Sequence, residues 1–222
     1  MKIIGHRGAK GLAPENTIDS FEKALEHQVN EIELDARLTA DGEVVVIHTS
    51  YLVDASGNKL KVAEHALSEL RTHKPDLPTL TEAINSVNRR VPIVVEVKPG
   101  VPTEPVVAII KAFLKKGWQP KDFLLASFSF KTLTELQAEL PDITKVVNDR
   151  WSGVRATRRA RLLGTKRLAM NRRWLWGGFI AAMRGSGYQL YAYTLNDPAK
   201  AKRWAKQGLA GVITDFPDLF EK

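Results

Sequence analysis

The sequence predicts a (β/α)₈ TIM barrel built as one domain over residues 1–222. Apolar runs of strand length alternate with segments of helical periodicity along the whole chain. Several runs are rich in Val, Ile and Leu, which is typical of strands covered on both faces. Eight strands, each followed by a helix, favour a closed parallel barrel, and an open doubly wound sheet is the alternative.

The elements follow one another in a regular order. The expected strands are 2–6, 31–35, 92–97, 123–128, 143–147, 167–170, 189–194 and 211–214. The expected helices are 16–28, 79–88, 103–116, 130–140, 153–163, 175–185, 197–207 and the short tail 217–222. Pro198 after Asn196-Asp197 is typical of a helix start, and Gly117 and Gly208 are typical of helix ends.

One segment interrupts this alternation. After the second strand the chain turns at Asp41-Gly42 and returns as 44–48. Asp-Gly between two strand-like runs indicates a β-hairpin, because so short a connection cannot join parallel neighbours. The return leg should bring His48 back to the level of Asp35. A long irregular loop, 49–78, is expected next, and loops of that length are usually functional.

Composition limits the class of protein. The chain has no cysteine and no apolar run of about 18 residues, and its first residues lack the pattern of a secretory signal. These features fit a cytoplasmic protein. The net charge of +8 is local, because 145–173 contains ten basic residues and one acid, Asp149. Such a patch suits phosphates, acidic lipid surfaces or nucleic acid.

Acidic residues occur at two neighbouring strand ends, where barrels place their active sites. Glu33 and Asp35 lie two apart on the second strand and therefore share a face, and Glu96 follows on the third. Three clustered carboxylates in a chain without cysteine predict a site for Mg²⁺ or Ca²⁺. Without a cation they would repel one another, and some would take up protons.

The alternative for these carboxylates is a structural one. They could form ion pairs inside the barrel with Arg7, Arg37 and Lys98. A single carboxylate would favour that interpretation, whereas three at the same end of adjacent strands favour a site. His6 ends the first strand, and His48 arrives beside it from the hairpin. Two histidines next to carboxylates suit general acid/base chemistry near neutral pH.

Nine short motifs along the chain carry a resemblance to a known family. They are His6-Arg7-Gly8, Pro14-Glu15-Asn16-Thr17, Glu33-Leu34-Asp35, Asp41-Gly42 with Val44–His48, Leu77-Pro78-Thr79-Leu80, Glu96-Val97-Lys98, Ser127-Phe128, Tyr193-Thr194-Leu195-Asn196 and Gly211–Pro217. In this order they resemble the glycerophosphodiester phosphodiesterases, which are related to the phosphatidylinositol-specific phospholipases C. The resemblance runs nearly end to end and is weakest between about residues 140 and 188.

The resemblance implies an enzyme that hydrolyses glycerophosphodiesters to glycerol 3-phosphate and an alcohol. It implies that His6 and His48 act as acid and base. It also implies a divalent cation on the three carboxylates, with Arg7 and Lys98 near the phosphate and Tyr193 on the substrate wall. Two residues depart from the family pattern: Thr49 stands where Asp is usual after the second histidine, and Tyr193 stands where Trp is usual.

Further residues are candidates for the rim of the site. They are Glu15, Asn16, Trp151, Arg172, Trp174 and Trp176. Arginine and indole groups together could grip an anionic or lipid-like headgroup. In the helix 153–163, by contrast, Arg155, Arg158 and Arg159 form a stripe that we expect to be a solvated outer face.

Other functions remain open at this point. A lysophospholipase D-like enzyme acting on lipid substrates would use the same residue set. Basic loops interleaved with tryptophan could bind single-stranded nucleic acid, which leaves the histidines and carboxylates unexplained. Thr49 is the one feature that favours a catalytically inactive barrel. The expected partner is a small-molecule glycerophosphodiester, with no nucleic acid, no stable membrane insertion, and a monomer or homodimer as the assembly.

Overall fold

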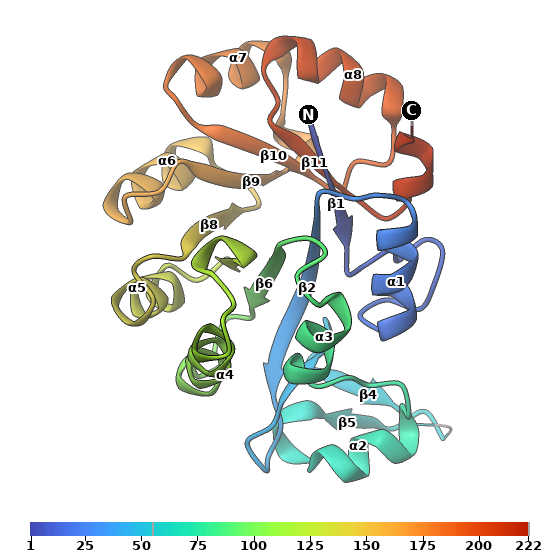
Figure 1. Ribbon diagram of the computed structural model, residues 1–222. Coiled ribbons are helices and arrows are strands. Elements are labelled where there is room, and N and C mark those ends of the chain that lie inside the picture. The colour runs from blue at the N-terminus through green and yellow to red at the C-terminus, as the bar shows by residue number, and fades with distance from the viewer. Residues whose placement is uncertain (55, 222) are drawn as a thin grey trace.

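The computed structural model describes residues 1–54 and 56–221, and its main sheet is a closed barrel (Figure 1). The barrel closes because β1 pairs in parallel with both β2 and β11. Its parallel strands are β1 (Lys2–His6), β2 (Glu31–Leu38), β6 (Ile93–Val97), β7 (Phe123–Ser127), β8 (Thr144–Asp149), β9 (Arg167–Asn171), β10 (Gln189–Tyr193) and β11 (Gly211–Thr214). The predicted (β/α)₈ barrel is confirmed, and the open sheet is excluded.

Helices surround the barrel on its outer side (Figure 1). They are α1 (Ile18–Glu26), α3 (Leu80–Val87), α4 (Glu104–Lys115), α5 (Phe130–Glu139), α6 (Gly153–Leu162), α7 (Gly177–Gly185) and α8 (Pro198–Gln207). After β11 a 3₁₀ turn, η4 (Pro217–Phe220), takes the place of the eighth helix. Lys222, which the sequence prediction included there, lies outside the described residues. No helix of the described chain is long and apolar enough to cross a bilayer.

Local chemistry explains why some boundaries differ from prediction. The first helix begins two residues later than expected, because Asn16 has φ +59°, which a helix does not accommodate. Thr17 caps it instead, and its side chain accepts a hydrogen bond from the Ser20 amide at 3.2 Å. The second strand is longer than expected, since β2 continues to Leu38 as the first leg of the hairpin.

The predicted hairpin is confirmed. β3 (Val44–Val46) runs antiparallel to the end of β2, with Ala36 opposite Val46. The predicted irregular loop after it is wrong, because much of that segment is ordered into short elements. These are β4 (Tyr51–Val53), β5 (Lys59–Lys61), η1 (Val62–Glu64) and α2 (Leu67–His73). They pack on a small core of their own, beside α3 in Figure 1, and each is too short to give a clear periodic signal.

The inner face of β2 places three acidic residues in line along the barrel axis: Glu31, Glu33 and Asp35. Glu31 is at the amino-terminal end, where Arg167 of β9 donates through both terminal guanidinium nitrogens to its carboxylate. Lys2 adds a further bond to Glu31 at 2.7 Å. We call this group, formed by Glu31, Arg167 and Lys2, the floor cluster. Sequence analysis did not identify it.

Candidate active site

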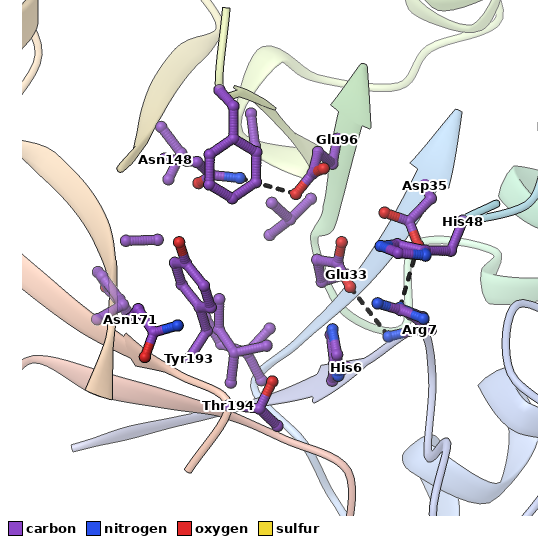
Figure 2. Close-up of a pocket in the computed structure, with 18 of the residues that line it drawn as sticks. His6, Arg7, Glu33, Asp35, His48, Glu96, Asn148, Asn171, Tyr193 and Thr194 are labelled. Atoms are coloured by element: carbon purple, nitrogen blue, oxygen red, sulfur yellow. Dashed lines mark hydrogen bonds and ion pairs between the residues drawn. The ribbon is translucent and has the colours of Figure 1, made fainter. Parts of the chain in front are cut away.

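A cavity of about 280 Å³ opens at the carboxyl-terminal end of the barrel strands. Eight of the residues singled out from the sequence line it together: His6, Arg7, Glu33, Asp35, His48, Glu96, Lys98 and Tyr193. Figure 2 shows how the labelled side chains of these residues converge from β1, β2, β6, β10 and the hairpin. The cavity therefore unites the predicted acid/base, carboxylate and phosphate-binding residues in one place.

Three buried carboxylates form the acidic part of the cavity. Glu33 and Asp35 project from the same face of β2, and Asp35 stands opposite Glu96 of β6 in the sheet register. All three are less than a tenth exposed, and one oxygen of each lies within 4.8 Å of the others. An all-oxygen cluster of this size is a ligand set that a hard divalent cation prefers.

Two cationic side chains, Lys98 and Arg7, offset only part of the negative charge of these three carboxylates. Lys98 Nζ lies 2.5 Å from Asp35 Oδ1 and also donates to Glu96. Arg7 Nε lies 3.2 Å from Asp35 Oδ2. Burial alone would raise the pKa of Asp35, but Lys98 and Arg7 outweigh it and hold that pKa below its usual range. The predicted structural alternative is thus realised for Asp35 and Glu96.

Glu33 is the carboxylate left over. Within the described residues it is hydrogen-bonded to the backbone N–H of Arg7, which donates to Oε2 at 3.0 Å. Burial raises the pKa of Glu33 well above its usual range, and the neighbouring charges of Asp35 and Glu96 raise it further. Burial likewise raises the pKa of Glu96. The cluster has more negative charge than its own cations offset, so these residues fit a bound divalent cation.

Two asparagines orient the carboxylates. Asn16 Nδ2 donates to Asp35 Oδ2 at 2.9 Å, and Asn148 Nδ2 donates to Glu96 Oε2 at 2.8 Å. Asn16 was predicted at the rim, but it is buried, and its role there is a correction to that prediction. Asn148 was missed, although it ends the inner face of β8, at the same level as the other site residues.

His6 has a carboxylate partner that sequence analysis also missed. Its Nδ1 lies 2.5 Å from Asp215 Oδ1, and Asp215 accepts a second bond from Asn196 Nδ2 at 3.0 Å. Burial would raise the pKa of Asp215, but its bonds to His6 and Asn196 hold it below its usual range. Asp215 directly follows β11, so reading the eighth strand end as closely as the first three would have found it.

His48 lies in a different setting. The backbone N–H of Ile47 donates to the Asp35 carbonyl at 2.9 Å, and Arg37 donates twice to the His48 carbonyl, which fixes the end of the hairpin. Burial lowers the pKa of His48 to about 4, despite the opposing charge of Asp35. The Thr49 hydroxyl donates to the Tyr51 carbonyl at 2.7 Å, so it is committed away from the imidazole.

The turn after His6 explains why glycine occupies position 8. Arg7 and Gly8 both have positive φ, of 52° and 84°. A Cβ at Gly8 would meet the backbone of Ser20 at 2.5 Å, so only glycine fits where the turn packs on α1. The turn directs the Arg7 guanidinium to Glu15, which accepts at 2.8 Å on both oxygens. Glu15 therefore positions Arg7, a more definite role than the rim position predicted for it.

Comparisons with known proteins agree with this geometry. A family model described as the glycerophosphoryl diester phosphodiesterase family matches residues 6–219. The chain belongs to that family. A glycerophosphodiester phosphodiesterase of Bacillus subtilis is 27% identical over 99% of this chain and 85% of its own length. Another, from Caldanaerobacter subterraneus, is 25% identical over 97% of this chain and 94% of its own.

Solved structures are similar over nearly the whole chain. A phosphodiesterase of Oleispira antarctica, in complex with its product sn-glycerol 3-phosphate, superposes with a TM-score of 0.85. It is 27% identical, over 98% of this chain and 94% of its own. The glycerophosphodiester phosphodiesterase of Thermotoga maritima superposes with a TM-score of 0.79 at 26% identity, over 99% of this chain and 96% of its own. The predicted family resemblance is confirmed.

In this glycerophosphodiester phosphodiesterase family member, Tyr193 forms the wall opposite the carboxylates (Figure 2). Its ring contacts Phe128 edge to face at 5.9 Å between centroids, and its hydroxyl donates to the Asp149 carbonyl at 3.1 Å. Burial raises the pKa of Tyr193, so the hydroxyl stays protonated. The hydroxyl that distinguishes it from tryptophan thus ties the wall to the end of β8.

The predicted rim residues of the second half of the barrel lie outside the main cavity. Trp151 lines an adjoining groove of about 530 Å³. The remaining three, Arg172, Trp174 and Trp176, are exposed and line neither cavity nor groove.

The expectation of a solvated arginine stripe on α6 is wrong in part. Arg155 donates to both oxygens of the buried Asp149, at 2.6 and 2.8 Å, and Arg159 lines the same groove. The Arg155 side chain reaches Asp149 because β8 ends at Asp149, four residues before α6 begins. Arg158 is exposed, as expected.

Proposed function

We propose that this protein hydrolyses glycerophosphodiesters to sn-glycerol 3-phosphate and an alcohol, with His6 and His48 as its acid/base pair. The observation that carries the proposal is the meeting, in one cavity, of two histidines in unlike settings beside three buried carboxylates. Membership of the family supports the reaction class, and a structural relative bound to sn-glycerol 3-phosphate supports the product.

His48 is suited to act as the base. With a pKa of about 4 it is neutral near pH 7, so one ring nitrogen has a free lone pair that can accept a proton from the attacking hydroxyl. That hydroxyl comes from water or from the glycerol of the substrate itself. His48 lines both the cavity and the adjoining groove, so it has access to either nucleophile.

His6 is suited to act as the acid. The carboxylate of Asp215 at 2.5 Å from Nδ1 stabilises positive charge on the ring, which leaves Nε2 to deliver a proton to the departing alkoxide. The pair would exchange roles in any second step. Thr49 offers His48 no such carboxylate, so the two rings have different hydrogen-bond partners.

The remaining residues would handle phosphate charge. Arg7 and Lys98 line the cavity and are positioned to neutralise the equatorial phosphoryl oxygens. Glu33, Asp35 and Glu96 would hold Mg²⁺ or Ca²⁺, which, when bound, supplies Lewis-acid stabilisation of a phosphoryl oxygen. Lys98 pairs with two of these carboxylates. A bound cation would offset their charge in its place, which would leave the Lys98 ammonium group free to turn to the phosphate.

The test is release of glycerol 3-phosphate from glycerophosphocholine and glycerophosphoethanolamine, with Mg²⁺, with Ca²⁺ and with EDTA. We expect metal-dependent turnover that EDTA abolishes. His6→Ala and His48→Ala should each lower kcat by about 10²–10⁴-fold, the usual contribution of a positioned acid or base. His73→Ala, at an exposed histidine on α2, is the matched control and should turn over as the wild type does.

Two results would contradict the proposal. Turnover near the wild-type rate in His6→Ala or His48→Ala would exclude the two-histidine scheme. No turnover with any metal would leave a barrel that binds phosphodiesters without cleaving them. The cytoplasmic location, and the monomer or homodimer as the assembly, stay predictions.

A further inference from the structure

Tryptophans gather on one side of the barrel mouth and are exposed there. Trp151, Trp174 and Trp176 are 60%, 48% and 64% exposed, and Val154 at the start of α6 is 82% exposed. Three of the five tryptophans of the chain are thus turned towards solvent within 26 residues. Large apolar side chains grouped in this way on a surface mark a contact with another apolar phase. We call these four residues the aromatic rim.

The rim is held in place from below. The rings of Trp151 and Trp174 contact each other edge to face at 5.7 Å between centroids, which joins the β8–α6 loop to η3 (Arg172–Trp174). Trp176 rests on Phe179 of α7 at 5.3 Å. These ring contacts hold the indoles at the surface. Their exposure is a property of how the two loops pack.

Positive charge surrounds the rim. Residues 150–176 contain nine arginines and lysines and no aspartate or glutamate. Exposed arginines in the same segments as the rim residues include Arg150, Arg155, Arg158, Arg172 and Arg173. The one adjacent acid, Asp149, is buried and accepts two bonds from Arg155. Apart from Arg155, these arginines form no ion pair within the described residues, and apolar side chains framed by them match an apolar layer covered by negative charge.

The rim also shares its direction with the active-site cavity. Its segments follow the carboxyl-terminal ends of β8 and β9, which form the mouth of the barrel. The groove that contains Trp151 adjoins the cavity, and His48, Lys98 and Arg150 line both of them. A surface that meets the aromatic rim would therefore also face the cavity.

We propose that the aromatic rim and its arginines form a docking surface for an anionic phospholipid bilayer. Indole rings prefer the interface between headgroups and acyl chains, and arginines nearby are attracted to anionic headgroups. The exposed isopropyl group of Val154 favours lipid over nucleic acid, because it offers no face for a base to stack on. A glycerophosphodiester that carries an acyl chain would then reach the cavity from the bilayer.

The full chain can be tested by sedimentation with vesicles of phosphatidylcholine alone and vesicles that contain about 30% phosphatidylglycerol, the anionic surface being the variable. We expect binding to the anionic vesicles at least roughly tenfold tighter than to the neutral ones, and weaker in high salt. Tryptophan emission should shift to shorter wavelength on binding, since the indoles leave water. The readout is binding, so it does not depend on the proposed hydrolysis.

Two variants separate the apolar and the charged parts of the surface. Trp174→Ser with Trp176→Ser should remove the emission shift and most of the binding, and Arg172→Gln with Arg173→Gln should remove the preference for anionic vesicles. Matched controls lie at the opposite end of the barrel: Leu162→Ser, exposed at the end of α6, and Lys115→Gln with Lys121→Gln. Circular dichroism during heating checks that each variant folds.

Several outcomes would overturn the proposal. The anionic vesicles could fail to bind the wild type, or the control variants could lose as much binding as the rim variants. A labelled oligothymidine that binds when vesicles do not would assign the rim to single-stranded nucleic acid. A dimer of the wild type that dissociates in the tryptophan variant, measured by size-exclusion chromatography, would assign it to a second copy of the chain.

Discussion

The two ends of the barrel both contain buried charge, but they balance it differently. In the floor cluster one carboxylate, Glu31, receives two bonds from Arg167 and one from Lys2, and the Arg167 guanidinium also lies 4.1 Å from the Tyr191 ring centroid. At the mouth, three carboxylates share two cationic side chains, and Glu33 has neither of them as a hydrogen-bond partner. Both groups include residues of the same face of the same strand.

The difference separates structural from functional charge. At the floor the Glu31 carboxylate is fully offset by cations, because Arg167 donates to both of its oxygens and Lys2 adds a third bond. An unbalanced group at the mouth is held in a high-energy arrangement by the barrel around it, and it is relieved only by a proton or a cation. The carboxylates are buried at both ends, so the balance of their partners is what distinguishes the two groups.

The largest effect should follow from removing Asp215, which belongs to the mouth. Asp215→Asn takes away the charge that stabilises a protonated His6, so we expect kcat to fall by about 10²-fold or more. The unfolding free energy should change far less than in the floor variant below. Steady-state kinetics and urea unfolding measure the two effects, with Asp142→Asn, an exposed aspartate, as the control. A variant with normal kcat would show that His6 needs no carboxylate.

The floor should respond in the opposite way. Arg167→Met leaves Glu31 buried with Lys2 as its one remaining cation, and breaking such a pair costs about 3–5 kcal/mol of stability. Arg167 also lines the cavity, so we expect turnover of the folded fraction to fall, but far less than in Asp215→Asn. Adding Glu31→Leu removes the stranded charge and should recover most of the loss. If Arg167→Met unfolds at the wild-type urea concentration, the floor cluster does not stabilise the barrel.

The stabilisation by a bound cation should also differ between variants of the mouth and variants of the floor cluster. Excess Mg²⁺ or Ca²⁺, at about 100 times its dissociation constant, should stabilise the wild type by about 2.7 kcal/mol, and EDTA should reverse this. Glu33→Gln should lose that increment and, in EDTA, unfold later than the wild type because one repulsive charge is gone. Arg167→Met should keep the increment. Thermal unfolding checks all three, and an equal response of both variants would remove the distinction.

The smallest effect concerns Lys145, a buried charge whose hydrogen bonds go to uncharged groups. Its ammonium group donates to the carbonyls of Leu140 and Ile143 at 2.5 Å, and burial lowers its pKa to about 8. The unfolded chain keeps this proton up to about pH 10.5, so between pH 8 and 10.5 it binds more protons than the folded protein. Stability should therefore rise there by about 1–3 kcal/mol relative to Lys145→Met. Parallel urea midpoints of the two proteins across this range would contradict it.

Sequence predicts the mouth well for a physical reason. Strand alternation places Glu33 and Asp35 on one face, and parallel strands bring Glu96 to the same end, so local pattern and one topological rule suffice. The hairpin that places His48 also depends on local sequence, because Asp41-Gly42 forms the turn between its two strands.

The missed features depend on residues that are distant in sequence. Glu31 and Arg167 are 136 residues apart, and nothing in either strand indicates that the other side chain reaches across the barrel. Asn148 meets Glu96 only because β7 separates their strands by the right distance around the barrel. The small elements between residues 51 and 73 were not predicted for another reason, because strands of three residues are too short to show a periodic pattern.

The bond between His6 and Asp215 joins residues 209 positions apart, at the end of the first strand and directly after the last strand of the barrel. Closing so long a stretch of chain is entropically costly, so we expect this contact to form more slowly than local ones. The hairpin that holds His48 can form as soon as its own ribbon does. During refolding, secondary structure should therefore return before turnover, and the appearance of turnover should time the moment at which β1 and β11 meet.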